Sequence, residues 1–186
     1  MEFISDRVSV ERTPTAMSVV ISTRLPAMQR NLLITWLLAW TVCGIYFVRE
    51  AARPQPREMM LTLWIMLGFW AYFELRILRV ALWRMKGFEI WRVREGELTV
   101  KNSLFGYGKA TRYFITNIHR FGKLNIEETS WKWQLSDSFW TRGAERLGFE
   151  YLGKKVAIGR GISADEEHRL AVLMGREFTR ERKVVQ

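Results

Sequence analysis

Two long apolar blocks dominate the first half of the sequence. Residues 31–48 carry no charged side chain, and Arg30 and Arg49 bound this block on either side. At a rise of 1.5 Å per residue, a helix of this length reaches about 27 Å, close to the thickness of the hydrocarbon core of a bilayer. A polar, proline-containing segment, residues 1–29, precedes the block, whereas a signal peptide begins nearer the N-terminus and ends in small residues. The block therefore predicts a retained transmembrane helix.

The second apolar block follows a short turn that contains Pro54 and Pro56. Residues 59–73 are uncharged, and apolar residues then continue to Trp83 between interspersed charged positions. Arginines near a helix end can extend their charged groups to the interface while their stems stay in the apolar region. We therefore expect a helix over about residues 58–84, which spans the bilayer first and then follows the headgroup layer. The short turn makes the two helices an antiparallel hairpin within residues 30–86.

The flanks of the hairpin carry more Lys and Arg than its loop, which favours cytoplasmic termini. Glu74 is an acidic residue close to the apolar region, and such residues are candidate functional groups. In an antiparallel hairpin the end of the second helix lies beside the start of the first. We therefore expect an intramembrane ion pair between Arg30 and Glu74, with a functional role for Glu74 as the alternative.

After Gly87 the hydrophobic pattern changes from a helical period to alternation. Seven short segments are typical of strands: residues 88–94, 97–102, 110–115, 117–121, 131–135, 147–152 and 155–158. A capping box of Ser163 and Glu166 then predicts a closing helix. Its apolar stripe consists of Leu170, Leu173, Met174 and Phe178. Residues 87–180 are thus expected to form a cytoplasmic domain, followed by a basic tail at residues 181–186.

Seven strands followed by one amphipathic helix is an order that resembles a pleckstrin-homology-like (PH-like) barrel, in which the helix closes one end. The resemblance is carried by the hairpin of residues 149–154, the turn of residues 158–161 and the helix start of residues 163–166. These segments are similar to the closing motifs of bacterial membrane proteins with two N-terminal transmembrane helices and a PH-like domain. The resemblance implies a membrane α+β fold in the bacterial inner membrane, with a seven-stranded PH-like barrel capped by the C-terminal helix. Residues 87–96 also resemble, over a shorter stretch, a segment of the photosystem I assembly protein of chloroplasts and cyanobacteria.

Composition limits the chemistry that this chain can carry. A single cysteine, Cys43, excludes an intramolecular disulfide and cysteine-based metal centres, and the two histidines, His119 and His168, leave little for metal binding. Nucleotide-binding, serine-hydrolase and zinc-protease motifs are missing from the sequence. The adjacent Glu127 and Glu128 are typical of a solvated loop. We therefore expect no enzymatic activity, cofactor or metal.

Charge is the remaining functional signal, because 29 Lys and Arg residues stand against 19 Asp and Glu residues, a net charge of +10. Each Lys or Arg beside an anionic leaflet contributes on the order of 1 kcal/mol to membrane attraction. The candidate membrane or lipid contacts are Arg76, Arg79, Arg84, Lys86, Arg92 and Arg94. The alternative is that these residues reflect only the ordinary positive-inside bias. No recognition helix or stacking platform indicates nucleic acid, so the lipid bilayer is the expected partner.

Two functions follow as expectations. The first is a non-enzymatic membrane-anchored interaction module, an accessory subunit or assembly factor of a larger membrane protein complex, for which the resemblance to the photosystem I assembly protein gives a precedent. Trp131, Trp133 and Trp140 are candidates for its docking surface, although Trp131 and Trp133, two residues apart, favour a place in the domain core. The alternative is a sensor of anionic lipid headgroups or a small ligand, which uses the basic membrane-proximal face.

Overall fold

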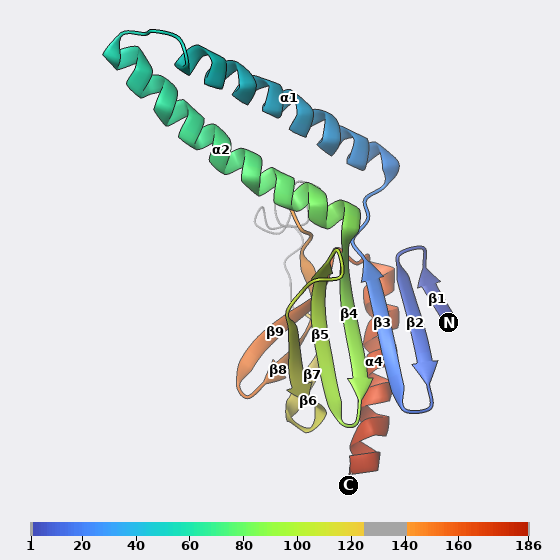
Figure 1. Cartoon of the computed structure of the whole chain (residues 1–186). Coiled ribbons are helices and arrows are strands. Elements are labelled where there is room, and N and C mark those ends of the chain that lie inside the picture. The colour runs from blue at the N-terminus through green and yellow to red at the C-terminus, as the bar shows by residue number, and fades with distance from the viewer. Residues whose placement is uncertain (1, 125–140, 186) are drawn as a thin grey trace.

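The computed structural model describes residues 2–124 and 141–185 and has an α+β fold with two long apolar helices in its N-terminal half (Figure 1). In chain order the elements are β1 (Glu2–Ser5), β2 (Val8–Thr13), β3 (Ala16–Ser22), α1 (Ala27–Ala51), α2 (Arg57–Lys86), β4 (Gly87–Arg94), β5 (Glu97–Leu104), β6 (Ala110–Phe114), the 3-10 helix η1 (Ile115–Asn117), β7 (Ile118–Lys123), β8 (Glu145–Tyr151), β9 (Lys154–Arg160) and α4 (Ala164–Val185).

The helix hairpin is inserted between two neighbouring strands of one sheet. Strands β3 and β4 pair in antiparallel register from Ala16–Arg94 to Ser22–Phe88, although the whole hairpin separates them in sequence. Residues 1–29 were expected to be a polar segment, but they supply three strands, β1–β3, to the β domain. The signal was present in the sequence, because buried residues alternate with less buried ones along β2 and β3.

The strands form two open sheets, which corrects the expectation of a closed seven-stranded barrel. One sheet has six strands in the order β1-β2-β3-β4-β5-β6, and the other has three in the order β7-β8-β9. The physical reason is that β3 occupies the edge of β4 and extends the sheet outward from there. Six of the seven expected strands correspond to β4–β9, and the seventh, at residues 131–135, lies outside the described residues.

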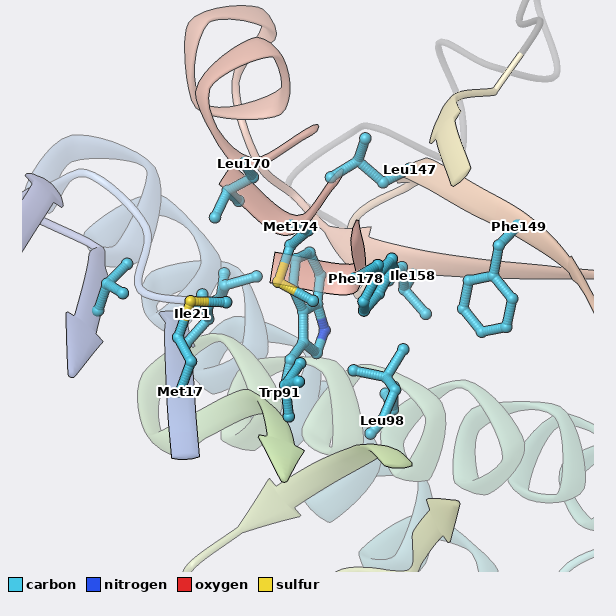
Figure 2. Packing of buried hydrophobic residues seen from close by; sticks show 14 of the residues in the cluster. Met17, Ile21, Trp91, Leu98, Leu147, Phe149, Ile158, Leu170, Met174 and Phe178 are labelled. Carbon is cyan, nitrogen blue, oxygen red and sulfur yellow. The ribbon is translucent and has the colours of Figure 1, made fainter. Parts of the chain in front are cut away.

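The core of the β domain lies between the two sheets and helix α4. Figure 2 shows Met174 and Phe178 of α4 beside Trp91 of β4, together with residues of both sheets. Leu170, Met174 and Phe178 are almost completely buried, which confirms the apolar stripe expected for the closing helix. Burying large apolar side chains of this kind contributes about 1.5–3 kcal/mol each, so this helix contributes strongly to the stability of the domain.

Helices α1 and α2 are long and apolar enough to cross a bilayer, and they extend away from the sheets as an antiparallel pair (Figure 1). At the domain end, α1 starts four residues before the expected bounds of 31–48, and α2 ends two residues after the expected bounds of 58–84. Gly44 of α1 allows the indole of Trp70 on α2 to pack directly against the helix backbone. The Trp70 indole N–H also donates to the carbonyl O of Trp40 at 2.9 Å.

Candidate anion-binding site at the base of the hairpin

The base of the hairpin is a tight junction between its helices and the central strands. Helix α2 continues into β4 without a loop, since Lys86 ends the helix and Gly87 begins the strand. The Thr23 hydroxyl lies 2.6 Å from the carbonyl O of Trp83 and 2.9 Å from that of Gly87. A Cβ at Gly87 would lie only 2.4 Å from the Trp83 carbonyl O, so glycine is required here. The contacts of Thr23 fix the linker between β3 and α1 against the end of α2.

A pocket of about 890 Å³ opens beside this junction. Its walls come from the β1–β2 turn, the linker before α1, the first turn of α1, the end of α2 and the loop between β9 and α4. The charged residues that line it are four arginines, Arg7, Arg24, Arg84 and Arg146, and two acidic residues, Asp6 and Glu166. Positive charge exceeds negative charge on these walls, and we call this cavity the arginine pocket.

Glu166 is neutralised by its own partners. The Ser5 hydroxyl donates to Oε1 at 2.5 Å, and the Arg7 guanidinium lies 3.2 Å from Oε2. The Ser163 amide donates to Oε2 at 2.7 Å and the Glu166 amide to the Ser163 hydroxyl at 3.3 Å, which confirms the expected capping box. Burial alone would raise the pKa of Glu166, but the hydrogen bonds from Ser5 and Ser163 and the charge of Arg7 outweigh it, so the pKa lies below its ordinary value.

Arg84 forms a buried wall of the pocket, whereas the sequence analysis expected a surface contact. Only 4 % of this residue is exposed, and its Nε donates to the carbonyl O of Thr141 at 2.7 Å. Its Nη1 lies beside Gly143 and Gly161, at 3.4 and 3.2 Å from where their Cβ atoms would be. Both glycines have positive φ, at +90° and +66°. The backbone therefore turns closely around the guanidinium and fixes it in the wall.

Arg24 is the most accessible cation of the pocket. Its side chain is exposed and forms no ion pair within residues 2–124 and 141–185. Arg146, in contrast, is mostly buried and lies 3.9 Å from a carboxylate oxygen of Glu167. Arg24 therefore has the greatest freedom to approach an anion, while the buried arginines supply fixed positive charge behind it.

Three further candidates lie near the same end of α2. Arg76 and Arg79 line a second pocket of about 590 Å³ together with Arg142, which lies just before β8. The Arg142 guanidinium lies 5.9 Å from the ring centroid of Trp83, a cation–π distance. Lys86 is exposed at the last position of the helix. Basic side chains thus gather around the domain end of the hairpin on several of its surfaces.

Arg92 and Arg94 lie elsewhere, which corrects their assignment to a membrane-proximal strand. Strand β4 starts at the hairpin and runs away from it (Figure 1), so Arg94 at its far end lies about 24 Å from Gly87. Arg94 forms an ion pair there with the neighbouring Glu95 at 2.7 Å. The two arginines therefore belong to the opposite end of the sheet from the arginine pocket.

The expected ion pair between Arg30 and Glu74 is also absent from the described structure, because the helix register gives Glu74 another partner. The Thr41 hydroxyl donates to Glu74 Oε1 at 2.8 Å. Arg30 lies about 16 Å before Thr41 along α1, so it is offset from Glu74 by about three turns. The half-buried Glu74 side chain thus forms part of the contact between the helices.

Arg7 and Arg146 were missed by the sequence analysis. Arg7 stands in the turn between β1 and β2, so recognising the alternating pattern of residues 8–21 would have placed it at a strand end. Arg146 is the second residue of β8, and its proximity to the hairpin depends on tertiary structure. Glu127, Glu128, Trp131, Trp133 and Trp140 lie outside the described residues.

Within the described parts of the chain, no three His, Cys, Asp or Glu side chains cluster as they would around a metal ion. The chain matches no protein-family model, no curated protein and no solved structure. The arginine pocket at the base of the hairpin is therefore the main structural indication of function.

Proposed function

We propose that this chain is a non-enzymatic, membrane-anchored interaction module that binds anionic lipid headgroups in the arginine pocket. The observation that carries the proposal is the position of the pocket, which opens where the apolar hairpin joins the β domain. If the hairpin spans a bilayer, its domain end lies at the headgroup layer, the depth at which lipid phosphates are found. An excess of arginine over carboxylate there matches a negatively charged headgroup.

The proposal includes a bacterial inner membrane with both termini on the cytoplasmic side. The support is the distribution of positive charge, because Lys and Arg near the ends of membrane helices favour the cytoplasmic face. Arg76, Arg79 and Lys86 would then face the anionic leaflet together with Arg24 of the pocket. The PH-like relationship is part of the same proposal. Its support is the element order, in which strands β4–β6 of one sheet, strands β7–β9 of the other and helix α4 follow one another, while β1–β3 extend the first sheet.

Ligand-induced stabilisation tests the proposal on the full chain in neutral detergent. A lipid that binds only the folded protein raises its thermal transition midpoint with increasing lipid concentration. We expect phosphatidylglycerol to raise the midpoint more than phosphatidylcholine. Arg24→Gln should remove most of that difference, and Arg92→Gln, a matched control at the far end of the sheet, should leave it unchanged. Equal shifts for the two lipids, or equal effects of the two substitutions, would refute binding in the arginine pocket.

A second candidate function is an accessory subunit or assembly factor of a larger membrane protein complex. The specific observation in its favour is the open six-stranded sheet, whose edge strands β1 and β6 lack a partner on their outer side among the described strands. A free strand edge can pair with an extended segment of another protein. Extraction in mild detergent, native gel separation and mass spectrometry test this candidate. Co-migration of stoichiometric partners would support it, and migration of the chain alone would count against it.

A further inference from the structure

The turn between β5 and β6 exposes two aromatic side chains on a rigid tip. The Leu104 amide donates to the Tyr107 carbonyl O at 2.8 Å and the Tyr107 amide to the Leu104 carbonyl O at 3.0 Å, which closes a two-residue turn. Phe105 is 58 % exposed and Tyr107 is 84 % exposed. The Lys101 ammonium donates to the carbonyl O of Gly106 at 3.1 Å and stiffens the tip.

Phe105 stands in a backbone conformation that a phenylalanine seldom adopts. Its φ is +53° and that of Gly106 is +86°, the left-handed pair of a type I′ turn. Asn or Gly normally occupies the first of these positions, because a bulky side chain there costs on the order of 1–2 kcal/mol. A phenylalanine that is 58 % exposed recovers only part of its burial energy in return. Leu152, 69 % exposed in the β8–β9 turn, has the same conformation at φ +49°, so the φ of Phe105 alone does not indicate a contact. The position of the turn in the fold decides what the exposed phenylalanine can contact.

The turn lies at the hairpin end of the sheet. Leu104, the residue before the tip, pairs with Gly87, and Gly87 directly follows the last residue of α2. Neighbouring strands are separated by about 4.8 Å, so the tip starts one strand away from the end of the hairpin. Figure 1 shows this turn close to the end of α2, at the opposite end of β5 from the β4–β5 turn.

We propose that Phe105 and Tyr107 form an interfacial anchor that inserts into the headgroup region of the bilayer beside the hairpin. The occupant is the lipid interface, since the tip is continuous with the end of an apolar hairpin long enough to span a membrane. Tyrosine favours this depth because its ring is apolar and its hydroxyl is hydrated, and the ring of Phe105 adds apolar surface beside it. The anchor requires the hairpin to lie in a bilayer, but it goes beyond headgroup recognition because it needs no anionic lipid.

Depth-dependent fluorescence quenching tests the anchor on the full chain in nanodiscs of pure phosphatidylcholine. In a Cys43→Ala background, an environment-sensitive fluorophore is attached to Tyr107→Cys, or to Glu95→Cys in the β4–β5 turn as control. Glu95 is also at positive φ before a glycine, and it lies about 27 Å away at the other end of β5. We expect nitroxide-labelled lipid to quench the fluorophore at position 107 at least threefold more than at position 95. Equal quenching would overturn the anchor.

The substitution Phe105→Asn separates anchoring from folding. Asparagine suits the left-handed conformation, so the variant should fold and its thermal midpoint in detergent should not fall. Quenching at position 107 should nevertheless decrease at least twofold, because Tyr107 is already replaced by the labelled cysteine and Phe105→Asn removes the anchoring ring that remains. Unchanged quenching would contradict a role for Phe105. If positions 107 and 95 are quenched equally while phosphatidylglycerol still stabilises the chain more than phosphatidylcholine, only the anchor is refuted. If position 107 is quenched more strongly but the two lipids stabilise the chain equally, only binding in the arginine pocket is refuted.

Discussion

The carboxylate of Glu89 on β4 accepts the backbone N–H of Arg160 on β9 at 2.8 Å and so joins the two sheets. The same carboxylate accepts the Gly159 amide at 3.0 Å and the Trp91 indole N–H at 2.9 Å, with only 1 % of Glu89 exposed. Hydrogen bonds to a buried carboxylate are stronger than those between neutral groups. Because Gly161 and Ser163 follow directly, this clamp also positions the loop that lines the arginine pocket.

Replacing Glu89 with glutamine tests the clamp. An amide nitrogen would face a backbone N–H in place of an acceptor, so one buried donor loses its partner. We expect Glu89→Gln to lower the free energy of unfolding by about 2 kcal/mol, measured by chemical denaturation in neutral detergent. Glu95→Gln, which changes an exposed ion pair, should cost well under 1 kcal/mol. If Glu89→Gln lowers the free energy of unfolding by as little as Glu95→Gln does, the clamp is dispensable for stability.

Two glycines of the hairpin make a matched pair for testing its packing. A Cβ at Gly44 would lie 1.9 Å from the Trp70 ring, whereas Gly68 on α2 has open space around the same position. Gly44→Ala should therefore destabilise the hairpin by about 1–3 kcal/mol, because either the indole or the helix must move. Gly68→Ala should be neutral or stabilise by up to about 1 kcal/mol through helix propensity. Thermal transitions of the full chain in detergent distinguish the two, and equal effects would contradict this helix register.

The partner of Glu74 can be identified by single substitutions on α1. Thr41→Val removes the hydroxyl that donates to Glu74, and we expect a loss of about 0.6–1.7 kcal/mol, as for other hydrogen bonds between membrane helices. Arg30→Gln should leave the stability of the hairpin unchanged. Both variants should be compared with the same substitutions in a Glu74→Gln background by a double-mutant cycle. If the double-mutant cycle gives an interaction free energy between Glu74 and Arg30, and none between Glu74 and Thr41, the ion pair expected from the sequence would be correct.

Glu166 makes the stability of the β1–β2 turn and the start of α4 depend on pH. Its pKa is lower in the folded chain than the ordinary value of 4.5, so its contribution is complete above that value and is lost as pH falls through the lowered pKa. Glu166→Gln should therefore cost about 2 kcal/mol at pH 7 and progressively less below pH 4.5. Denaturation of both proteins between pH 7 and pH 3 measures this difference. A cost independent of pH would mean that the Glu166 charge is not stabilised by Ser5, Ser163 and Arg7.

Much of the fold could be predicted from local pattern. The two apolar blocks predict long helices, the alternation in β4–β9 predicts strands, and the capping box with its apolar stripe predicts helix α4. Each of these elements has a local signal that predicts one type of secondary structure. The strands β2 and β3 carry the same alternation, in Val8, Val10, Met17, Val19 and Ile21, so they are predictable by the same rule. The pairing of β3 with β4 spans the whole hairpin, and no local pattern reports a contact at that separation.

The candidate site was harder to predict than the fold. The exposed arginines at the end of α2 were found because they interrupt an apolar helix. The prediction for Arg92 and Arg94 was wrong, because the two residues are close to the hairpin in sequence but β4 runs away from it in space. Arg7 and Arg146 reach the pocket through the pairing of β2 with β3 and of β8 with β9. The pocket therefore required the tertiary structure.

Both lipid-binding proposals require the hairpin to lie in a bilayer, and Cys43 offers a direct test in the unmodified chain. This cysteine is exposed on α1, about 12 Å before its end and about 24 Å after its start. The measurement is the rate at which a charged, membrane-impermeant maleimide modifies Cys43 in sonicated membranes from expressing cells, with Cys43→Ala/Thr15→Cys as the water-exposed control. We predict that Cys43 resists modification until the membranes are dissolved in denaturing detergent, while the control reacts at once. Modification of Cys43 at the rate of the control would contradict the membrane anchor and, with it, both lipid-binding proposals.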